Sequence, residues 1–243
     1  MNPIAFELGP LRVHWYGIII AVAVAIGLLV ARRLGKRFDY PAGIFEDFLI
    51  YVLPVALIGA RLYYVAFNWA PYAADPARII AVWEGGLAIH GAVLAAILVA
   101  LWFCRRRNMD FFRFVDIAAG PLILGQAIGR WANYVNQEAY GTPTDLPWAM
   151  YIAGEYRHPT FLYESLWNLL IFGILVWYLR KQPQPGRVFA MYLIGYSIGR
   201  FFIEGLRTDS LMLGPLRIAQ VISIAFILIG IGYFVYTKRR REV

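Results

Sequence analysis

The chain is poor in charge and in cysteine. Of its 243 residues, 16% are charged and 60% are hydrophobic, whereas soluble domains are about a quarter charged and about half apolar. This shortage of charge excludes an ordinary soluble domain and indicates an integral membrane protein. The lone Cys104 excludes an internal disulfide and any metal site built on two cysteines. We expect it to be buried and inert.

The N-terminus also lacks the basic segment of a secretory signal peptide. Glu7 precedes the first apolar run, and the basic residues follow that run instead of preceding it. We therefore expect the run to stay in the mature protein. No internal repeat or linker is evident, so we expect a single polytopic membrane domain over residues 1–243.

Seven stretches have the length and composition of a membrane-spanning helix, which needs about 20 mostly apolar residues. They are residues 15–34, 44–67, 87–104, 114–135, 160–179, 188–206 and 218–237. A helix satisfies its own backbone hydrogen bonds in lipid. The predicted fold is therefore an all-α integral membrane protein with seven transmembrane helices.

Basic residues gather in alternate connections between these stretches, and this pattern predicts the orientation. Fifteen of the 23 Lys and Arg residues follow stretches one, three, five and seven. They are Arg32, Arg33, Lys36, Arg37, Arg105, Arg106, Arg107, Arg113, Arg180, Lys181, Arg187, Lys238, Arg239, Arg240 and Arg241. The positive-inside rule then places the N-terminus outside and the C-terminus in the cytoplasm. The net charge of +8 is thereby explained by topology, so we expect no nucleic-acid partner.

The two longest outer connections, 68–86 and 136–159, are rich in proline and aromatic residues. Such composition is typical of structured loops. We expect them to form a small extracytoplasmic cap.

Four arginines lie inside or at the outer ends of the stretches: Arg61, Arg130, Arg200 and Arg207. An arginine at the centre of a span costs about 2.5–3.5 kcal/mol on insertion scales, so it should face protein or water and have a partner. Snorkelling to the headgroups is the alternative for Arg61 or Arg207 taken alone.

The segment "YSIGRFFIEGLR" places Tyr196, Arg200, Glu204 and Arg207 on one side of a predicted helix. Glu204 can pair with either arginine, which leaves one guanidinium with spare positive charge. A planar fork of donors with spare charge suits a phosphate. A purely structural ion-pair ladder is the alternative.

The segment "GQAIGRWANYVNQEAYG" has the same character. Arg130, Asn133 and Gln137 share a helical face, and Gly141 allows the backbone to turn where the loop begins. These side chains predict a pocket for the headgroup of an anionic lipid.

Small residues four apart permit close helix packing. Gly125 with Gly129, and Gly195 with Gly199, form two such pairs on the fourth and sixth stretches. We expect these stretches to come together and to bring Arg130 near Arg200.

The segment "WEGGLAIHG" supplies a titratable group, His90, just inside the third stretch. A hydrogen-bonded interfacial histidine is the alternative to a catalytic one. His14 and His158 lie far from it in sequence, and the three histidines show no metal-ligand spacing.

Gly195 to Gly199, "GYSIG", matches the G-x-S-x-G nucleophile elbow of serine hydrolases around Ser197. That elbow needs a strand, a sharp turn and a helix, whereas this match lies within an apolar helical stretch. An intramembrane serine hydrolase remains an alternative function, as does a lipid transporter or binding scaffold. A transporter would more often show repeated halves and broken helices at mid-membrane.

The sequence resembles prolipoprotein diacylglyceryl transferases. The matching pieces run in family order: "WYG" (15–17), "GARLYYV" (59–65), "GGLAIHG" (85–91), "GRWANYVNQEAYG" (129–141), "HPTFLYES" (158–165) and "YSIGRFFIEGLR" (196–207). Three positions depart from the family pattern by replacing a usual glycine: Ala92, Ala132 and Gln137. These departures affect packing of small residues more than charge.

The resemblance implies a seven-span enzyme of the bacterial inner membrane, active towards the outer leaflet. It would move a diacylglyceryl group from phosphatidylglycerol to the lipobox cysteine of a preprolipoprotein, forming a thioether and releasing glycerol phosphate. No metal or organic cofactor is implied. The functional positions carried over are Tyr16, His90, Arg130, Asn133, Glu138, Gly141, Tyr196, Arg200, Glu204 and Arg207.

The residue types fit this chemistry. Arginines held on the phosphate oxygens would stabilise the charge that develops on the leaving group. We expect Arg130 and Arg200 to clamp the phosphoglycerol, with Asn133, Tyr196 and Glu204 orienting the headgroup or the arginines, and Arg61 among the further substrate-binding residues. A thiol is mostly protonated at neutral pH, so His90 is the candidate general base. A cationic site could also deprotonate the thiol without a base.

Overall fold

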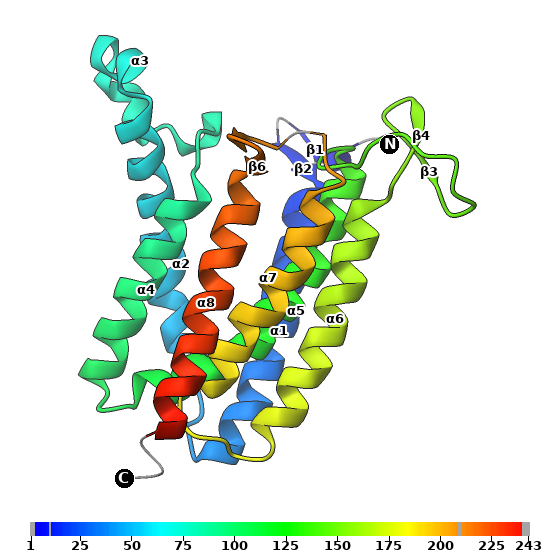
Figure 1. The fold of residues 1–243 in the computed structure, drawn as a ribbon. Coiled ribbons are helices and arrows are strands. Elements are labelled where there is room, and N and C mark those ends of the chain that lie inside the picture. The colour runs from blue at the N-terminus through cyan, green and yellow to red at the C-terminus, as the bar shows by residue number, and fades with distance from the viewer. Residues whose placement is uncertain (1–2, 10, 209, 240–243) are drawn as a thin grey trace. The chain divides into compact units, whose positions relative to one another are not determined.

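The computed structural model describes residues 3–9, 11–208 and 210–239, and it is mostly helical (Figure 1). The α-helices are α1 (Trp15–Gly35), α2 (Ile44–Phe67), α3 (Trp69–Ala74), α4 (Ile89–Arg106), α5 (Phe111–Val135), α6 (Thr160–Leu179), α7 (Arg187–Glu204) and α8 (Ile218–Arg239). The 3₁₀ helices are η1 (Lys36–Phe38), η2 (Pro76–Ile80) and η3 (Val82–Glu84). Three short antiparallel hairpins pair β1 (Ile4–Leu8) with β2 (Leu11–His14), β3 (Met150–Ile152) with β4 (Glu155–Arg157), and β5 (Met212–Leu213) with β6 (Leu216–Arg217).

The long helices coincide with the apolar stretches of the sequence. The bounds of α2 and α6 match the prediction, and the other long helices agree with it within three residues at each end. Arg240 and Arg241, which contribute to the basic C-terminal cluster, lie outside the described residues. The agreement is expected because a long apolar segment has no other way to pair its backbone in lipid.

Six helices in the described part of the chain are long and apolar enough to cross a membrane: α1 with η1, α2, α4, α5, α6 and α8. Their surfaces carry large aliphatic side chains that are well over half exposed, such as Ile50, Leu98 and Leu228. A soluble fold would bury such side chains, whereas lipid solvates them. The prediction of an all-α integral membrane protein is confirmed.

Helix α7 is the remaining predicted span. It has 18 residues, as many as α4, but it carries three charged residues, Arg187, Arg200 and Glu204. Its composition alone therefore does not mark it as a span. The seven-span count and the orientation stay predictions.

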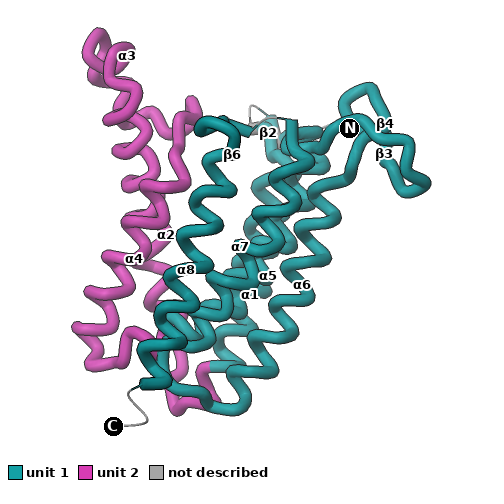
Figure 2. The backbone as a smooth tube through the Cα atoms, in the orientation of Figure 1, with its two compact units in different colours: residues 1–34, 115–243 teal, residues 35–114 magenta. Residues whose placement is uncertain are grey.

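The chain divides into two compact units (Figure 2). Unit 1 comprises Met1–Leu34 and Val115–Val243, and it contains α1, α5, α6, α7 and α8. Unit 2 comprises Gly35–Phe114 and contains α2, α3 and α4. This division does not test whether residues 1–243 fold as one domain.

In unit 2, α2 and α4 lie against each other at two glycines. A Cβ atom added to Gly91 would lie 2.2 Å from the carbonyl oxygen of Gly59, and one added to Gly59 would lie 2.5 Å from Ala95 Cβ. Toward the start of α2 and the end of α4, Phe48, Phe103 and Phe114 form an aromatic core with ring centroids 5.0–6.1 Å apart. The glycines are required because only hydrogen atoms fit between the two backbones.

In unit 1, α7 packs between α6 and α8. A Cβ atom at Gly199 would lie 2.1 Å from Trp167 Cδ1 of α6, and one at Gly230 of α8 would lie 2.8 Å from the carbonyl oxygen of Ala190. The fully buried carboxylate of Asp116 on α5 accepts hydrogen bonds from the backbone N–H groups of Gly186 and Phe189, both at 2.8 Å. It thereby satisfies donors at the first turn of α7 and fixes where that helix begins.

The two loops that were expected to form a cap both have defined structure. Loop 136–159 contains the β3–β4 hairpin, whose turn uses positive φ angles at Ala153 (51°) and Gly154 (90°). Loop 68–86 contains α3, η2 and η3. They belong to different units, unit 1 and unit 2 respectively.

Candidate functional site

An ion cluster lies where α5, α6 and α7 of unit 1 meet. We use this name for Arg130, Glu164, Arg200, Glu204 and Arg207. Glu164 of α6 joins the two predicted arginines: its Oε2 lies 2.7 Å from Arg130 Nη2, and its Oε1 lies 2.8 Å from Arg200 Nη1. The prediction that Arg130 and Arg200 come close together is therefore confirmed.

The ion cluster continues to the end of α7. Arg200 Nη2 lies 2.6 Å from Glu204 Oε2, and Arg207 Nε lies 3.7 Å from the same oxygen. Glu204 thus pairs with both arginines rather than with one. Helix α7 ends at Glu204, so Arg207 lies just beyond it and still faces that carboxylate through a tight turn.

The burial and charge of the ion cluster suit an anion. The side chains of Glu164 and Glu204 are only 4% and 5% exposed, whereas Arg130 and Arg200 keep 19% and 16% of their surface exposed. Three guanidinium groups face two carboxylates, which leaves one net positive charge. The positive charge is thus the more accessible one, as binding of a phosphate requires.

Arg217 of β6 braces the end of α7. Its Nη1 donates to the carbonyl oxygen of Glu204, and its Nη2 donates to that of Arg207 at 2.9 Å. These bonds satisfy carbonyl groups that a helix end leaves free. They also add a second positive charge beside the ion cluster.

The glycine pairs act differently from the prediction. Gly195 and Gly199 pack against α6, where Ile171 and Trp167 fill the space that a side chain would need. Trp167 is fixed there because its Nε1 donates to the carbonyl oxygen of Gly195 at 2.8 Å. Gly125 has no atom within 4 Å of an added Cβ. The expectation that these glycines join α5 to α7 was wrong, and the carboxylate of Glu164 instead joins Arg130 to Arg200.

Asn133 and Glu138 form a polar link next to Arg130. Asn133 Nδ2 donates to Glu138 Oε1 at 2.8 Å, and Arg130 Nη1 donates to Asn133 Oδ1 at 3.5 Å. Gln137 does not share their face: α5 ends at Val135, and Gln137 has a positive φ of 53°. Its side chain instead contacts the backbone of Tyr134 and of the β3–β4 turn.

Gly141 has a steric reason to be glycine. An added Cβ would lie 2.6 Å from His158 Cβ and 3.1 Å from Thr160 Cγ2. Its N–H donates to the carbonyl oxygen of His158, and it forms an isolated bridge with Arg207. Gly141 therefore brings the loop close enough to brace the end of α7.

Two tyrosines, Tyr196 and Tyr16, belong to the predicted site. Tyr196 lies one turn before Arg200 on the same face of α7, partly exposed, with its ring stacked on that of Tyr192 at 5.9 Å. Tyr16 lies exposed in the first turn of α1. Gly129 of α5 faces Ile20 of α1, and Tyr16 is one turn further along that face, toward Asn133.

Arg61 of α2 directs its guanidinium at the backbone of loop 76–86. It is 4% exposed. Its Nε donates to the carbonyl oxygen of Ile79 at 2.8 Å, its Nη1 to those of Gly85 and Gly86 at 2.6 and 3.1 Å, and its Nη2 to that of Arg78 at 2.5 Å. Arg61 thus makes four hydrogen bonds to the backbone of this loop, and its role in substrate binding stays a prediction.

His90 lies at the start of α4, in unit 2. It is the second residue of the helix and is exposed, with its ring 5.9 Å from that of Tyr63. Neither nitrogen has a hydrogen-bond partner among the described residues. Its role as a base stays a prediction.

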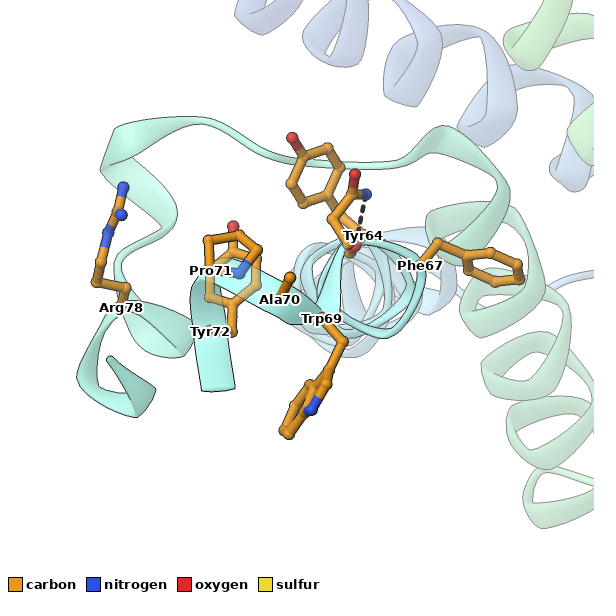
Figure 3. A pocket seen from close by; sticks show the side chains of 8 residues that line it. Tyr64, Phe67, Trp69, Ala70, Pro71, Tyr72 and Arg78 are labelled. Carbon is orange, nitrogen blue, oxygen red and sulfur yellow. Dashed lines mark hydrogen bonds between the residues drawn. The ribbon is translucent and has the colours of Figure 1, made fainter. Parts of the chain in front are cut away.

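Unit 2 also has an open hollow of about 460 Å³ at the end of α2 (Figure 3). Tyr64, Phe67, Trp69 and Tyr72 line it, and Arg78 lies at its margin. Arg78 pairs with Glu84 at 3.1 Å, and this hydrogen bond raises the pKa of Arg78 above its ordinary value. The hollow thus offers aromatic surface and an arginine whose charge is already compensated.

Two further expectations concern Ser197 and metal ligands. Ser197 lies 1% exposed in the middle of the continuous helix α7, so the nucleophile elbow is absent at this position. Among the residues that the structure describes, no three side chains of the types His, Cys, Asp and Glu gather as metal ligands would.

Sequence reasoning missed Glu164. The segment "HPTFLYES" contains it, and a carboxylate within an apolar span is itself a signal of a buried partner. The sequence prediction started from the four arginines of the predicted spans. None of these arginines lies on the same predicted stretch as Glu164, 160–179. Its two partners come from other helices, so helical periodicity could not identify them.

Comparison with known proteins places the chain in a family. Residues 3–236 match the family model for prolipoprotein diacylglyceryl transferase. A phosphatidylglycerol–prolipoprotein diacylglyceryl transferase of Synechococcus elongatus is 49% identical over 95% of this chain and 85% of its own length. Proteins with the same name from Trichormus variabilis and Bacillus cereus are 45% and 47% identical over 98% of this chain, and over 91% and 93% of their own lengths. The likeness covers α1 to α8, including every residue of the ion cluster, and the chain therefore belongs to the prolipoprotein diacylglyceryl transferase family.

Proposed function

We propose that this chain transfers the diacylglyceryl group of phosphatidylglycerol to the lipobox cysteine of a preprolipoprotein. The family and the names of its relatives support a transferase that uses phosphatidylglycerol and a prolipoprotein. The observation that carries the proposal is the bridge from Glu164 to both Arg130 and Arg200, which holds two partly exposed guanidinium groups together with net positive charge.

The reaction breaks one C–O bond and forms one C–S bond. The sulfur of the lipobox cysteine attacks the glyceryl carbon that carries the phosphate ester, and glycerol phosphate leaves with the bonding electron pair. The thiol proton passes to a base, because the thiolate is the nucleophile. The product is a thioether, and neither a metal nor an organic cofactor enters the balance.

Arg130 and Arg200 act on the leaving group. As the C–O bond breaks, negative charge grows on the phosphate oxygens, and preorganised guanidinium donors stabilise it more than they stabilise the substrate. Glu164 fixes both guanidinium groups before the lipid arrives. Glu204 and Arg207 extend this arrangement, and Asn133 with Glu138 orients Arg130.

Four further residues have roles in the proposal. His90 is the candidate general base for the thiol. Tyr16 and Tyr196 contact the headgroup, and Gly141 brings the loop against the end of α7.

The chain would span the bacterial inner membrane seven times with its N-terminus outside, and the site would face the outer leaflet.

The two other functions have less support. A serine hydrolase would need Ser197 accessible and activated, but Ser197 is buried within α7. A lipid transporter or binding scaffold would not be expected to match transferases over nearly its whole length.

Incubation of the purified protein with phosphatidylglycerol and a lipobox peptide tests the proposal. We expect the peptide to gain the mass of one diacylglyceryl group, and a Ser197→Ala variant to behave in the same way. Cleavage of the peptide that is lost in Ser197→Ala would support the hydrolase. Lipid binding without any change of the peptide would support the scaffold.

A further inference from the structure

Loop 76–86 and the start of α4 depend on one buried side chain in unit 2. Figure 1 shows the chain returning from α3 through this loop to α4, which runs alongside α2. The loop contains two short 3₁₀ helices and then Gly85 and Gly86, both with positive φ angles of 85° and 67°. Such a segment has little regular structure to hold it in place.

Arg61 holds loop 76–86 in place through hydrogen bonds to its backbone. Four loop carbonyl groups, those of Arg78, Ile79, Gly85 and Gly86, converge on its guanidinium at 2.5–3.1 Å. The guanidinium also stacks over the Tyr72 ring at 5.2 Å. Within the described residues Arg61 has no carboxylate partner, so backbone carbonyl dipoles and the Tyr72 ring surround this charge. A buried arginine of this kind is expensive and is kept for a purpose.

Two backbone contacts between α2 and α4 continue this attachment toward His90. The N–H of Ala88 donates to the carbonyl oxygen of Ala60, the neighbour of Arg61, at 3.1 Å. Gly91 then packs on Gly59 and leaves no room for a side chain. His90 lies between these two attachment points, four residues beyond Gly86. Since His90 is itself exposed, its backbone rather than its packing determines where its ring lies.

We infer that Arg61 is a positioning residue, which clamps loop 76–86 and thereby sets the position of His90. The inference rests on the proposed function, because His90 is the candidate base there. In this role Arg61 acts on the reaction through the position of His90 and does not itself bind the substrate. Lysine cannot substitute, because an ammonium is a compact point charge without the planar fork that reaches several carbonyl groups at once.

The test compares Arg61→Lys and Arg61→Ala with the wild-type protein in diacylglyceryl transfer to a lipobox peptide. We expect kcat to fall by about a hundredfold, the effect of displacing a catalytic group by about 1 Å, with the KM for phosphatidylglycerol within about twofold of wild type. Low millimolar guanidinium should restore kcat in Arg61→Ala by filling the site, whereas ammonium should not. Arg78→Gln is the matched control, since it keeps the carbonyl that Arg61 uses and should retain wild-type kcat.

Hydrogen exchange gives a readout that is independent of activity. Backbone amides of residues 78–91 should exchange faster in Arg61→Lys, while those of the β3–β4 hairpin in unit 1 should not change. Gly86→Ala tests the clamp from the loop side, because its Cβ would lie 2.6 Å from Arg61 Nη1 and 2.8 Å from the Tyr64 ring. It should produce the same exchange pattern and the same loss of kcat.

The outcomes separate the possibilities. A raised KM with unchanged kcat would overturn the inference and return Arg61 to substrate binding. Unchanged exchange in residues 78–91, or loss of kcat that guanidinium does not restore, would also overturn it. If wild-type protein makes no lipidated peptide at all, the proposed function fails, whereas the exchange pattern still decides whether Arg61 holds the loop.

Discussion

Replacing Glu164 by Gln tests the central feature of the ion cluster. Glutamine keeps the shape and one acceptor oxygen but removes the charge that joins Arg130 and Arg200 at 2.7 and 2.8 Å. Breaking a buried ion pair typically costs about 3–5 kcal/mol. Because both arginines are partly exposed and Arg200 keeps Glu204, we expect the lower end, about 3 kcal/mol. This corresponds to a loss of about a hundredfold in kcat/KM if the arrangement acts in the transition state.

Glu164→Gln also changes the charge of the ion cluster, and this effect opposes the loss of activity. Removing one carboxylate raises the net charge of the ion cluster from +1 to +2, counting its three arginines against its two glutamates. This change attracts the phosphate more strongly and lowers the KM. Catalysis requires donors that are fixed before the reaction, so the loss of geometry should exceed this gain.

The assay is transfer of the diacylglyceryl group to a lipobox peptide, with kcat and KM for phosphatidylglycerol measured separately. Glu155→Gln is the control: its pair with Arg157 has the same 2.7 Å distance, but the Glu155 side chain is 56% exposed. Exposed pairs contribute little, so this variant should retain wild-type activity. A Glu164→Gln enzyme with equal or higher kcat/KM would refute the reasoning, because Glu164 would then only compete with the substrate for the arginines.

Three further predictions follow from the same contacts. Arg130→Lys should lose most transfer activity although it keeps the charge, because a lysine cannot present two parallel donors; near-wild-type kcat/KM would contradict a bidentate phosphate contact. His90→Gln should lower kcat because the candidate base is lost, and full turnover across a pH series would exclude His90 as the base. Gly199→Ala should destabilise the protein by about 1–3 kcal/mol through overpacking, since its Cβ would lie 2.1 Å from the fixed ring of Trp167. Thermal unfolding in detergent measures this, and Gly125→Ala, which has open space around its Cβ, should not destabilise; equal effects of the two variants would refute the packing argument.

The positions of the long helices could be predicted because the information is local. An apolar stretch of about 20 residues must form a helix in lipid, whatever its neighbours are. The sequence therefore indicated α2 and α6 at their observed bounds. It also identified the arginines, because any charge in such a stretch is costly and must have a partner.

The partners of those charges could not be predicted from the sequence. Periodicity relates residues on one helix, so it predicted that Glu204 pairs with Arg200 or with Arg207, four and three residues away, and the structure pairs it with both. Glu164 lies 34 residues after Arg130 and 36 before Arg200, and its carboxylate reaches both because α6 packs on α7 at Gly199 and on α5 at Ala127. The hydrogen-bond partners of Arg61 could not be predicted either, because they are backbone carbonyl groups, which every residue has. The sequence by itself determined which segments form long apolar helices and which charges need partners. Only the tertiary structure decided how these charges are paired, because ion pairs and hydrogen bonds depend on distances between helices that no local pattern encodes.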